Sequence, residues 1–176
     1  SIPKAFSESF YTSLTGGDLK TVLDTLSYIR NKTAVWLEIT TLIIPGENDS
    51  DSEIKKLAQW VLNELGSETP LHFSAFHPDY KMKEKPSTSL SSLVRARDIA
   101  RETGLVHVYT GNVTYPPGDT TFCHNCGASL IERERYEIST YQLTEFGYCN
   151  KCGTQLVGKF GRKSGDWGSK RRPVRI

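Results

Sequence analysis

Apolar residues between positions 18 and 111 alternate between a helical period and strand-like runs. Three segments, around residues 22–29, 54–65 and 90–100, repeat apolar side chains three and four positions apart, which predicts amphipathic helices. Between and after them lie runs rich in β-branched residues that predict strands over residues 35–44, 71–76 and 106–110. Helices and strands that alternate at this spacing indicate parallel strands joined by right-handed crossovers. Since a closed barrel of the common kind needs about eight strands, we expect residues 1–113 to form an α/β fold, either the C-terminal part of a partial (βα) TIM-like barrel or an open sheet.

The second predicted helix has the clearest ends. Ser50 and Glu53 have the spacing of a capping box, and Gly66 follows the last apolar position. We therefore expect a helix that begins after Ser50 and ends before Gly66. After the third strand, residues 114–119 contain Pro116, Pro117 and Gly118 and are expected to link this part to a second module.

The four cysteines form two Cys-x-x-Cys-Gly turns, at Cys123 and Cys126 and at Cys149 and Cys152. Two residues between the cysteines let both sulfurs of one turn reach a single ion about 2.3 Å away, and two such turns complete a tetrahedron. Cysteines used in this way are typical of a reducing compartment, so the sequence predicts a cytoplasmic protein with a metal site and no disulfides.

Zinc and iron are both compatible with four thiolates. We expect Zn²⁺, because the turns lie outside the α/β part, where a redox-silent structural ion is sufficient. His124 lies between two ligands and is expected to be an exposed bystander. Residues 118–158 should then form a small zinc ribbon that depends on its ion for folding. Its strands are expected to use Ile131, Tyr136, Ile138, Tyr141 and Leu143.

Charge is distributed unevenly. Residues 159–175 contain seven basic side chains and one acid, a net charge of +6; since the whole chain carries +2, the remainder carries −4. Residues 159–176 therefore form a basic tail. It is either a solvated end of the chain or a docking strip for an anionic partner.

Candidate chemistry lies on the predicted strands and at their carboxyl ends, where α/β proteins place their sites. Trp36, Glu38, Thr40 and Leu42 share one face of the first strand, and Val35, Leu37, Ile39 and Ile43 share the other, which we expect to face the helices. Glu38 is then either functional or paired in a polar core. His77 follows the second strand, where it either contacts a ligand or caps a turn.

Three segments and the cysteine turns resemble one family in this order. They are residues 42–49 (LIIPGEND), residues 71–82 (LHFSAFHPDYKM), residues 109–113 (YTGNV) and the paired Cys-x-x-Cys-Gly turns. The family is the radical S-adenosylmethionine (SAM) enzyme of the AmmeMemoRadiSam system, related to pyruvate formate-lyase activating enzymes. The resemblance implies a partial barrel that binds a [4Fe–4S] cluster and SAM and cleaves SAM reductively to a 5′-deoxyadenosyl radical.

The resemblance also implies roles for two residues. His77 matches a histidine near the SAM nucleoside in activating enzymes, and Lys4 matches the lysine of an Asp-x-Lys motif at the end of the fourth strand, although Ile2 replaces the aspartate. The Cys-x-x-x-Cys-x-x-Cys loop that holds the cluster has no counterpart, because no cysteine precedes Cys123. The chain thus resembles the C-terminal half of such an enzyme, and the cluster and SAM belong to the intact protein.

Three functions remain open at this point. In the first, the chain is part of a radical SAM enzyme with an unknown substrate and protein partners from that system. In the second, it is a zinc-ribbon binding module whose basic tail contacts nucleic acid, with Phe160 and Trp167 as stacking residues. In the third, it is a structural subunit that completes another chain's barrel. In each case an incomplete parallel sheet leaves open edges, so we expect the isolated chain to self-associate. No apolar run is long enough to span a membrane.

Overall fold

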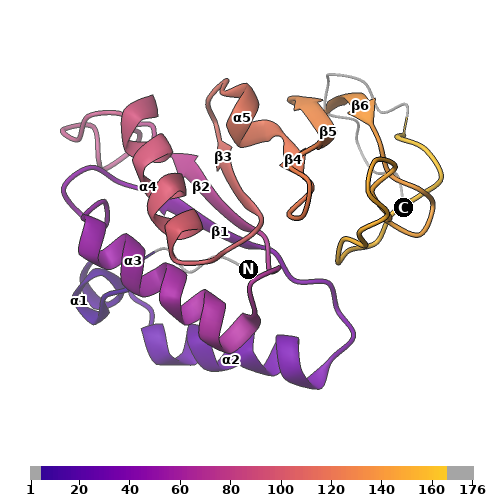
Figure 1. Ribbon diagram of the computed structural model, residues 1–176. Coiled ribbons are helices and arrows are strands. Elements are labelled where there is room, and N and C mark those ends of the chain that lie inside the picture. The colour runs from indigo at the N-terminus through magenta and orange to yellow at the C-terminus, as the bar shows by residue number, and fades with distance from the viewer. Residues whose placement is uncertain (1–4, 166–176) are drawn as a thin grey trace, which may run out of the picture. The chain divides into compact units, whose positions relative to one another are not determined.

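The computed structural model describes residues 5–165, so Lys4, Trp167 and most of the basic tail lie outside the described residues. The chain divides into two compact units, Ser1–Val113 and Thr114–Ile176, and each is described by itself. Figure 1 shows the elements of both units.

The first unit contains a parallel sheet of three strands in the order β1-β2-β3, as the alternation of helices and strands predicted. The strands are β1 (Ile39–Ile43), β2 (Leu71–Ala75) and β3 (Val108–Gly111). Ile39 is in register with Leu71, and Leu71 with Val108.

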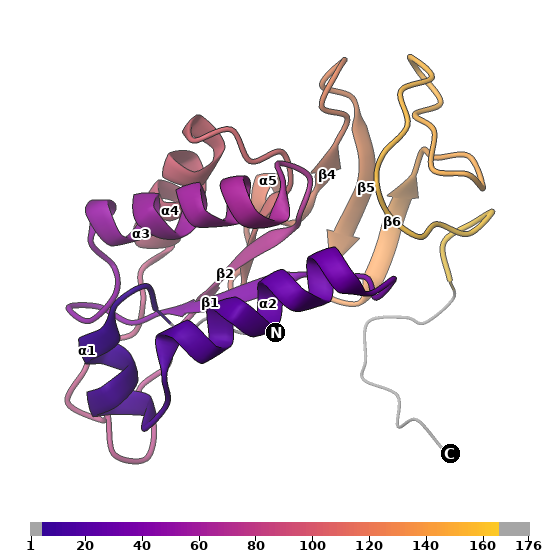
Figure 2. The same cartoon turned by 90° about the horizontal axis from the view of Figure 1, so that it is seen from below.

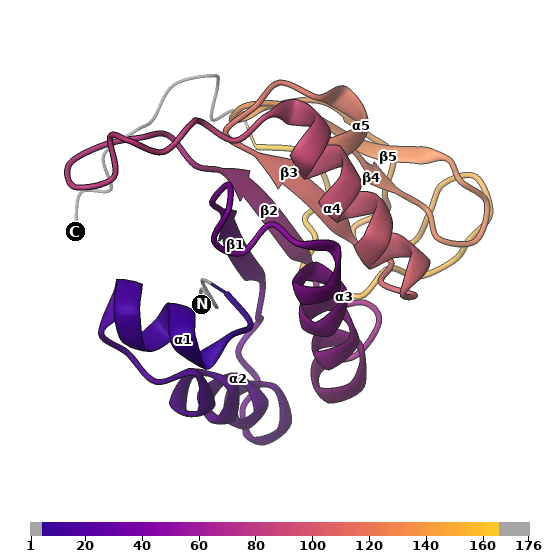
Figure 3. The same ribbon diagram turned by 90° about the vertical axis from the view of Figure 1, so that its left-hand side faces the viewer.

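Helices connect these strands, and two of them pack side by side on one face of the sheet. The chain begins with α1 (Glu8–Phe10), which continues as the π-helical turn η1 (Tyr11–Thr15). It then forms α2 (Leu19–Lys32) before β1, α3 (Asp51–Trp60) with its π-helical extension η2 (Val61–Leu65) before β2, and α4 (Leu90–Glu102) before β3. Figure 3 shows α3 and α4 side by side over the sheet.

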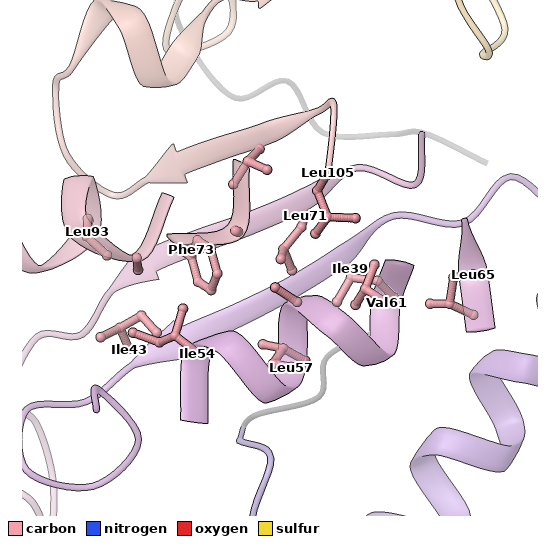
Figure 4. Packing of buried hydrophobic residues seen from close by; sticks show 14 of the residues in the cluster. Ile39, Ile43, Ile54, Leu57, Val61, Leu65, Leu71, Phe73, Leu93 and Leu105 are labelled. Atoms are coloured by element: carbon pink, nitrogen blue, oxygen red, sulfur yellow. The ribbon is translucent and has the colours of Figure 1, made fainter. Parts of the chain in front are cut away.

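The core of this unit lies between α3, α4 and the sheet (Figure 4). Phe73 at the centre of β2 is fully buried, as are Ile39 and Leu93 on neighbouring elements. The predicted helix-facing set on the first strand is confirmed for Leu37, Ile39 and Ile43, whereas Val35 is 66% exposed.

The ends of the second helix are confirmed. The Ser50 hydroxyl accepts a hydrogen bond from the backbone N–H of Glu53 at 3.3 Å, and Gly66 follows η2 with a φ of +95°. The Glu53 carboxylate, however, accepts the backbone N–H of Phe6 at 2.9 Å. This glutamate therefore ties the start of the described chain to the start of α3.

All three strands differ from their predicted bounds, and the third covers Val108–Gly111 in place of residues 106–110. The first begins at Ile39 and not at Val35, because its partner strand begins only after Pro70, whose carbonyl accepts the N–H of Ile39 and which has no N–H to extend the ladder. The second strand ends before Phe76, since that residue's N–H is bound by the Thr88 hydroxyl at 2.9 Å.

The second unit is a small antiparallel sheet with loops. After the short helix α5 (Pro116–Asp119), which replaces the expected irregular linker, come β4 (Thr121–Phe122), β5 (Ser129–Glu134) and β6 (Glu137–Tyr141). Figure 2 shows β5 and β6 side by side. Tyr136 is not a strand residue as predicted, because it lies in the turn between β5 and β6 and is 50% exposed.

Six residues form the core of the second unit: Cys123, Leu130, Ile131, Leu143, Cys149 and Leu156. Two of the six are cysteines, so the small apolar core is continuous with the candidate metal site. Across residues 5–165, none of the helices has both the length and the apolar character needed to cross a bilayer.

A candidate metal centre of four cysteines

The two cysteine turns have the same backbone structure. In the first, the N–H of Cys123 donates to the carbonyl of Ala128 at 2.8 Å, and the N–H of Gly127 donates to the carbonyl of Cys123 at 2.9 Å. In the second, Cys149 N–H donates to the carbonyl of Thr154 at 2.9 Å, and Gly153 N–H donates to the carbonyl of Cys149 at 2.8 Å. The same sequence spacing therefore builds two equivalent loops.

A glycine is needed where each loop turns back. Gly127 has a φ of +69° and Gly153 a φ of +73°, a left-handed backbone that other residues adopt only at a cost. This conformation lets the chain fold around the two thiols of its own turn. The glycine after each cysteine pair therefore has the same structural role in both turns.

The four sulfur atoms lie together, all within 4.8 Å of one another. Across the two turns, the Sγ atoms of Cys123 and Cys152 are 3.6 Å apart and those of Cys126 and Cys149 are 3.8 Å apart. A tetrahedral ion with bonds of about 2.3 Å has sulfur–sulfur edges of about 3.8 Å. A disulfide would need about 2.05 Å. The spacing therefore fits one metal ion and no disulfide.

Polar neighbours stabilise the thiolate of Cys152 on the second turn. The Thr154 hydroxyl lies 3.2 Å from the Cys152 sulfur, and Asn125 Nδ2 donates to Thr154 Oγ1 at 3.0 Å. The hydroxyl of Thr154, and then its backbone N–H, lower the pKa of the Cys152 thiol to about 6. Such outer groups orient and stabilise metal ligands.

Sequence reasoning missed Asn125 and Thr154. Thr154 directly follows the second Cys-x-x-Cys-Gly turn. Because that turn folds back on itself, the residue after it lies beside the thiols. His124 is exposed and does not belong to the group of metal-ligand side chains found among residues 5–165, as predicted.

The other predicted site residues do not join this centre. His77 follows β2, its side chain is 77% exposed, and its Nδ1 lies 3.3 Å from Asp79 Oδ2. Lys4 lies outside the described residues. Phe160 was expected to be available for base stacking, but its ring covers Gly147 and Gly158 and packs against the core of the second unit.

Comparison with known proteins finds an archaeal relative of this chain. The chain is 42% identical over 148 residues to an uncharacterized protein of Methanocaldococcus jannaschii. The match covers 84% of this chain and 44% of that protein, so the chain spans less than half the length of this relative. No family model matches the chain.

Proposed function

We propose that the four cysteines bind one Zn²⁺ ion with a structural role. The observation that carries this proposal is the near-tetrahedral spacing of four sulfurs from two equivalent turns. Four protein ligands leave no open position for a substrate, which is typical of structural zinc sites. A cluster with several irons would hold its thiolates further apart than the single-ion spacing seen between these sulfurs.

The zinc would supply folding free energy to the second unit. With two cysteines among its six core residues, this unit has little apolar surface to bury without the ion. Cys123 and Cys149, both buried, would hold the ion against the core, while Cys126 and Cys152 close the site on the outer side.

We further propose that the chain is the C-terminal part of a radical SAM enzyme similar to pyruvate formate-lyase activating enzymes. Three observations support this: the resemblance in residues 42–49, 71–82 and 109–113, the parallel sheet with helices on one face, and the relative that is more than twice as long as the matched region. The ligands of a [4Fe–4S] cluster would have to come from the rest of the protein, because no cysteine precedes Cys123 in this chain.

This chain's own contribution would be the binding and orientation of SAM and substrate. His77 is proposed to contact the nucleoside of SAM, since it lies exposed after the carboxyl end of β2. Lys4 is proposed to contact SAM because it matches the lysine of the Asp-x-Lys motif in the sequence resemblance. When bound in the intact protein, the cluster and SAM would supply a 5′-deoxyadenosyl radical for hydrogen abstraction.

The coding sequence upstream of Ser1 tests this proposal first, because a Cys-x-x-x-Cys-x-x-Cys motif there is required. The longer protein, reconstituted anaerobically with iron and sulfide, should then release 5′-deoxyadenosine from SAM when a reductant is added, and the 176-residue chain should release none. His77→Ala in the longer protein should weaken SAM binding by about 1–2 kcal/mol, the scale of one hydrogen bond. Absence of the motif, or of SAM cleavage by a protein that contains its cluster, would refute the proposal.

A further inference from the structure

Two aromatic side chains are exposed on the second unit, on either side of a buried glycine. Phe146 is 69% exposed and Tyr148 is 39% exposed, whereas Gly147 between them is buried. The Gly147 carbonyl accepts the N–H of Leu156 at 2.9 Å, and Tyr148 is bridged to the residue before Leu156. The two aromatic residues therefore lie beside the exposed neighbours of Leu156. We call these four exposed residues the aromatic face: Phe146, Tyr148, Gln155 and Val157.

The backbone of the aromatic face is held from the core side by one ring. Phe160 packs against the core of the second unit. A Cβ would come within 2.4 Å of this ring at Gly147 and within 2.6 Å at Gly158, so the ring lies against both segments. The next residue, Gly161, accepts the Tyr141 hydroxyl at 2.8 Å. The segments that carry the aromatic face are thus fixed on their inner side, as a preorganised binding surface requires.

The chain around the aromatic face is basic. From residue 146 to residue 165, the sequence contains four basic side chains and no acid. Two of them, Lys151 and Lys159, are exposed. Glu145, which directly precedes this stretch, forms an ion pair with Arg162. The surroundings of the face are therefore suited to an anionic ligand.

Aromatic rings beside lysines favour one class of partner. Interfaces between proteins are depleted in lysine, and a stable one buries about 800 Å² on each partner, more than three apolar side chains supply. Sites for single-stranded nucleic acid instead combine rings that stack on bases with basic side chains along the phosphates. Residues 159–175, with a net charge of +6, continue the basic chain beyond the face. The combination therefore fits a nucleic-acid strand better than it fits a protein.

We propose that the aromatic face binds single-stranded nucleic acid. Phe146 and Tyr148 stack on bases, and Lys151 and Lys159 contact phosphates. Phe160, which the sequence suggested as a stacking residue, supports the face from within. Base rings and phosphates are common to RNA and DNA, so the face accepts both. The proposal requires the folded second unit, and hence its metal ion, but it does not depend on SAM cleavage.

Fluorescence anisotropy with short labelled oligomers of uridine and of thymidine tests the face on the zinc-loaded 176-residue chain. Both oligomers should bind saturably, and more tightly than a duplex of the same length, whose bases already stack on one another. Phe146→Ala and Tyr148→Ala should each weaken binding about fivefold or more, the scale of one lost base stack. Phe146→Tyr should restore it, because the ring is kept.

Tyr28→Ala is the matched aromatic control, because Tyr28 is 62% exposed and lies on α2 of the first unit. It should bind both oligomers as the unchanged chain does. The zinc content of every variant is measured beside its affinity, so that loss of the face is distinguished from unfolding of the second unit. If an alanine variant loses zinc, the lysine variants carry the test.

The salt dependence of binding tests the two lysines. The logarithm of the binding constant should fall less steeply with the logarithm of the salt concentration when Lys151→Gln and Lys159→Gln are combined. The expected change in slope is about 1.4, because each phosphate contact on a single strand contributes about 0.7. Lys55→Gln with Lys56→Gln is the matched control, since both side chains are exposed on α3 of the first unit, and it should leave the slope unchanged.

Unchanged affinity after the combined Phe146→Ala and Tyr148→Ala exchange would show that the basic residues alone attract the strand, and would overturn the proposal. Equal affinity for the duplex would do the same. So would loss of binding in the longer protein, because another part of that protein would then cover the face. A preference of more than about tenfold for one of the two oligomers would retain the site and assign it to RNA or to DNA.

Discussion

Loss of one zinc ligand should unfold the second unit and leave the first intact. Cys149→Ser replaces a thiolate with a hydroxyl that stays protonated and does not complete the sulfur tetrahedron. Cys149 is only 2% exposed and is one of the six core residues of its unit, so the change removes a ligand and a core contact together.

The expected magnitude follows from the size of that core. Structural zinc sites in small peptides contribute about 10–16 kcal/mol of apparent binding free energy at neutral pH. Small domains as a whole are stable by about 5–15 kcal/mol. The core of the second unit contains only four residues other than cysteine, so this unit has little stability without zinc. Loss of even half of the zinc binding free energy should therefore exceed the free energy of unfolding that the remaining contacts supply. The first unit has its own core around Phe73 and needs no ion.

Two-dimensional NMR of the labelled chain measures both units at once. In Cys149→Ser, amide signals of residues 120–157 should collapse to the random-coil region, while those of residues 18–103 keep their positions. His124→Ala, which changes an exposed neighbour of two ligands, should keep zinc and all signals. Dispersed signals from the second unit without metal, or loss of the signals of the first unit, would refute the reasoning.

Three further outcomes are expected. Thr88→Val should lower the free energy of unfolding of the first unit by about 2–4 kcal/mol, measured by urea denaturation. The buried Thr88 hydroxyl donates to the Ile43 carbonyl at 2.5 Å and accepts the Phe76 N–H, and valine makes neither hydrogen bond. A loss under about 1 kcal/mol would contradict this. Gly147→Ala should weaken zinc retention against a chelator more than Gly153→Ala does. Both glycines have a positive φ, but of the two only Gly147 has a neighbour that a Cβ would meet, the Phe160 ring at 2.4 Å. Equal effects would show that the Phe160 ring moves aside and would contradict the prediction. The isolated chain should self-associate in sedimentation at micromolar concentration, because β1 and β3 are the outer strands of an open sheet, and a clean monomer would contradict this.

The order and type of the main elements were predictable because apolar residues recur along the chain with the same spacing as the buried positions of a helix or a strand. Leu71 and Phe73 alternate toward the core, and the helix stripe that begins at Ile54 faces it. The ends of the strands were not predictable from the period alone. They depend on the neighbouring strand, as at Pro70, or on a distant side chain, as at Thr88.

The cysteine site was predictable from spacing because each turn is a local structure. The groups around it were not, since Asn125 reaches Thr154 from the other turn. Glu38 was expected to be either functional or paired, and the structure pairs it with His72 and Trp36. That pairing depends on the register of two parallel strands, which the sequence of either strand alone does not specify.

Metal analysis with X-ray absorption on the freshly purified 176-residue chain tests the account most directly. We predict one zinc per chain with four sulfur ligands at about 2.3 Å and no nitrogen ligand. Iron in place of zinc, less than half an equivalent of any metal, or a nitrogen ligand from His124 would contradict the proposed site.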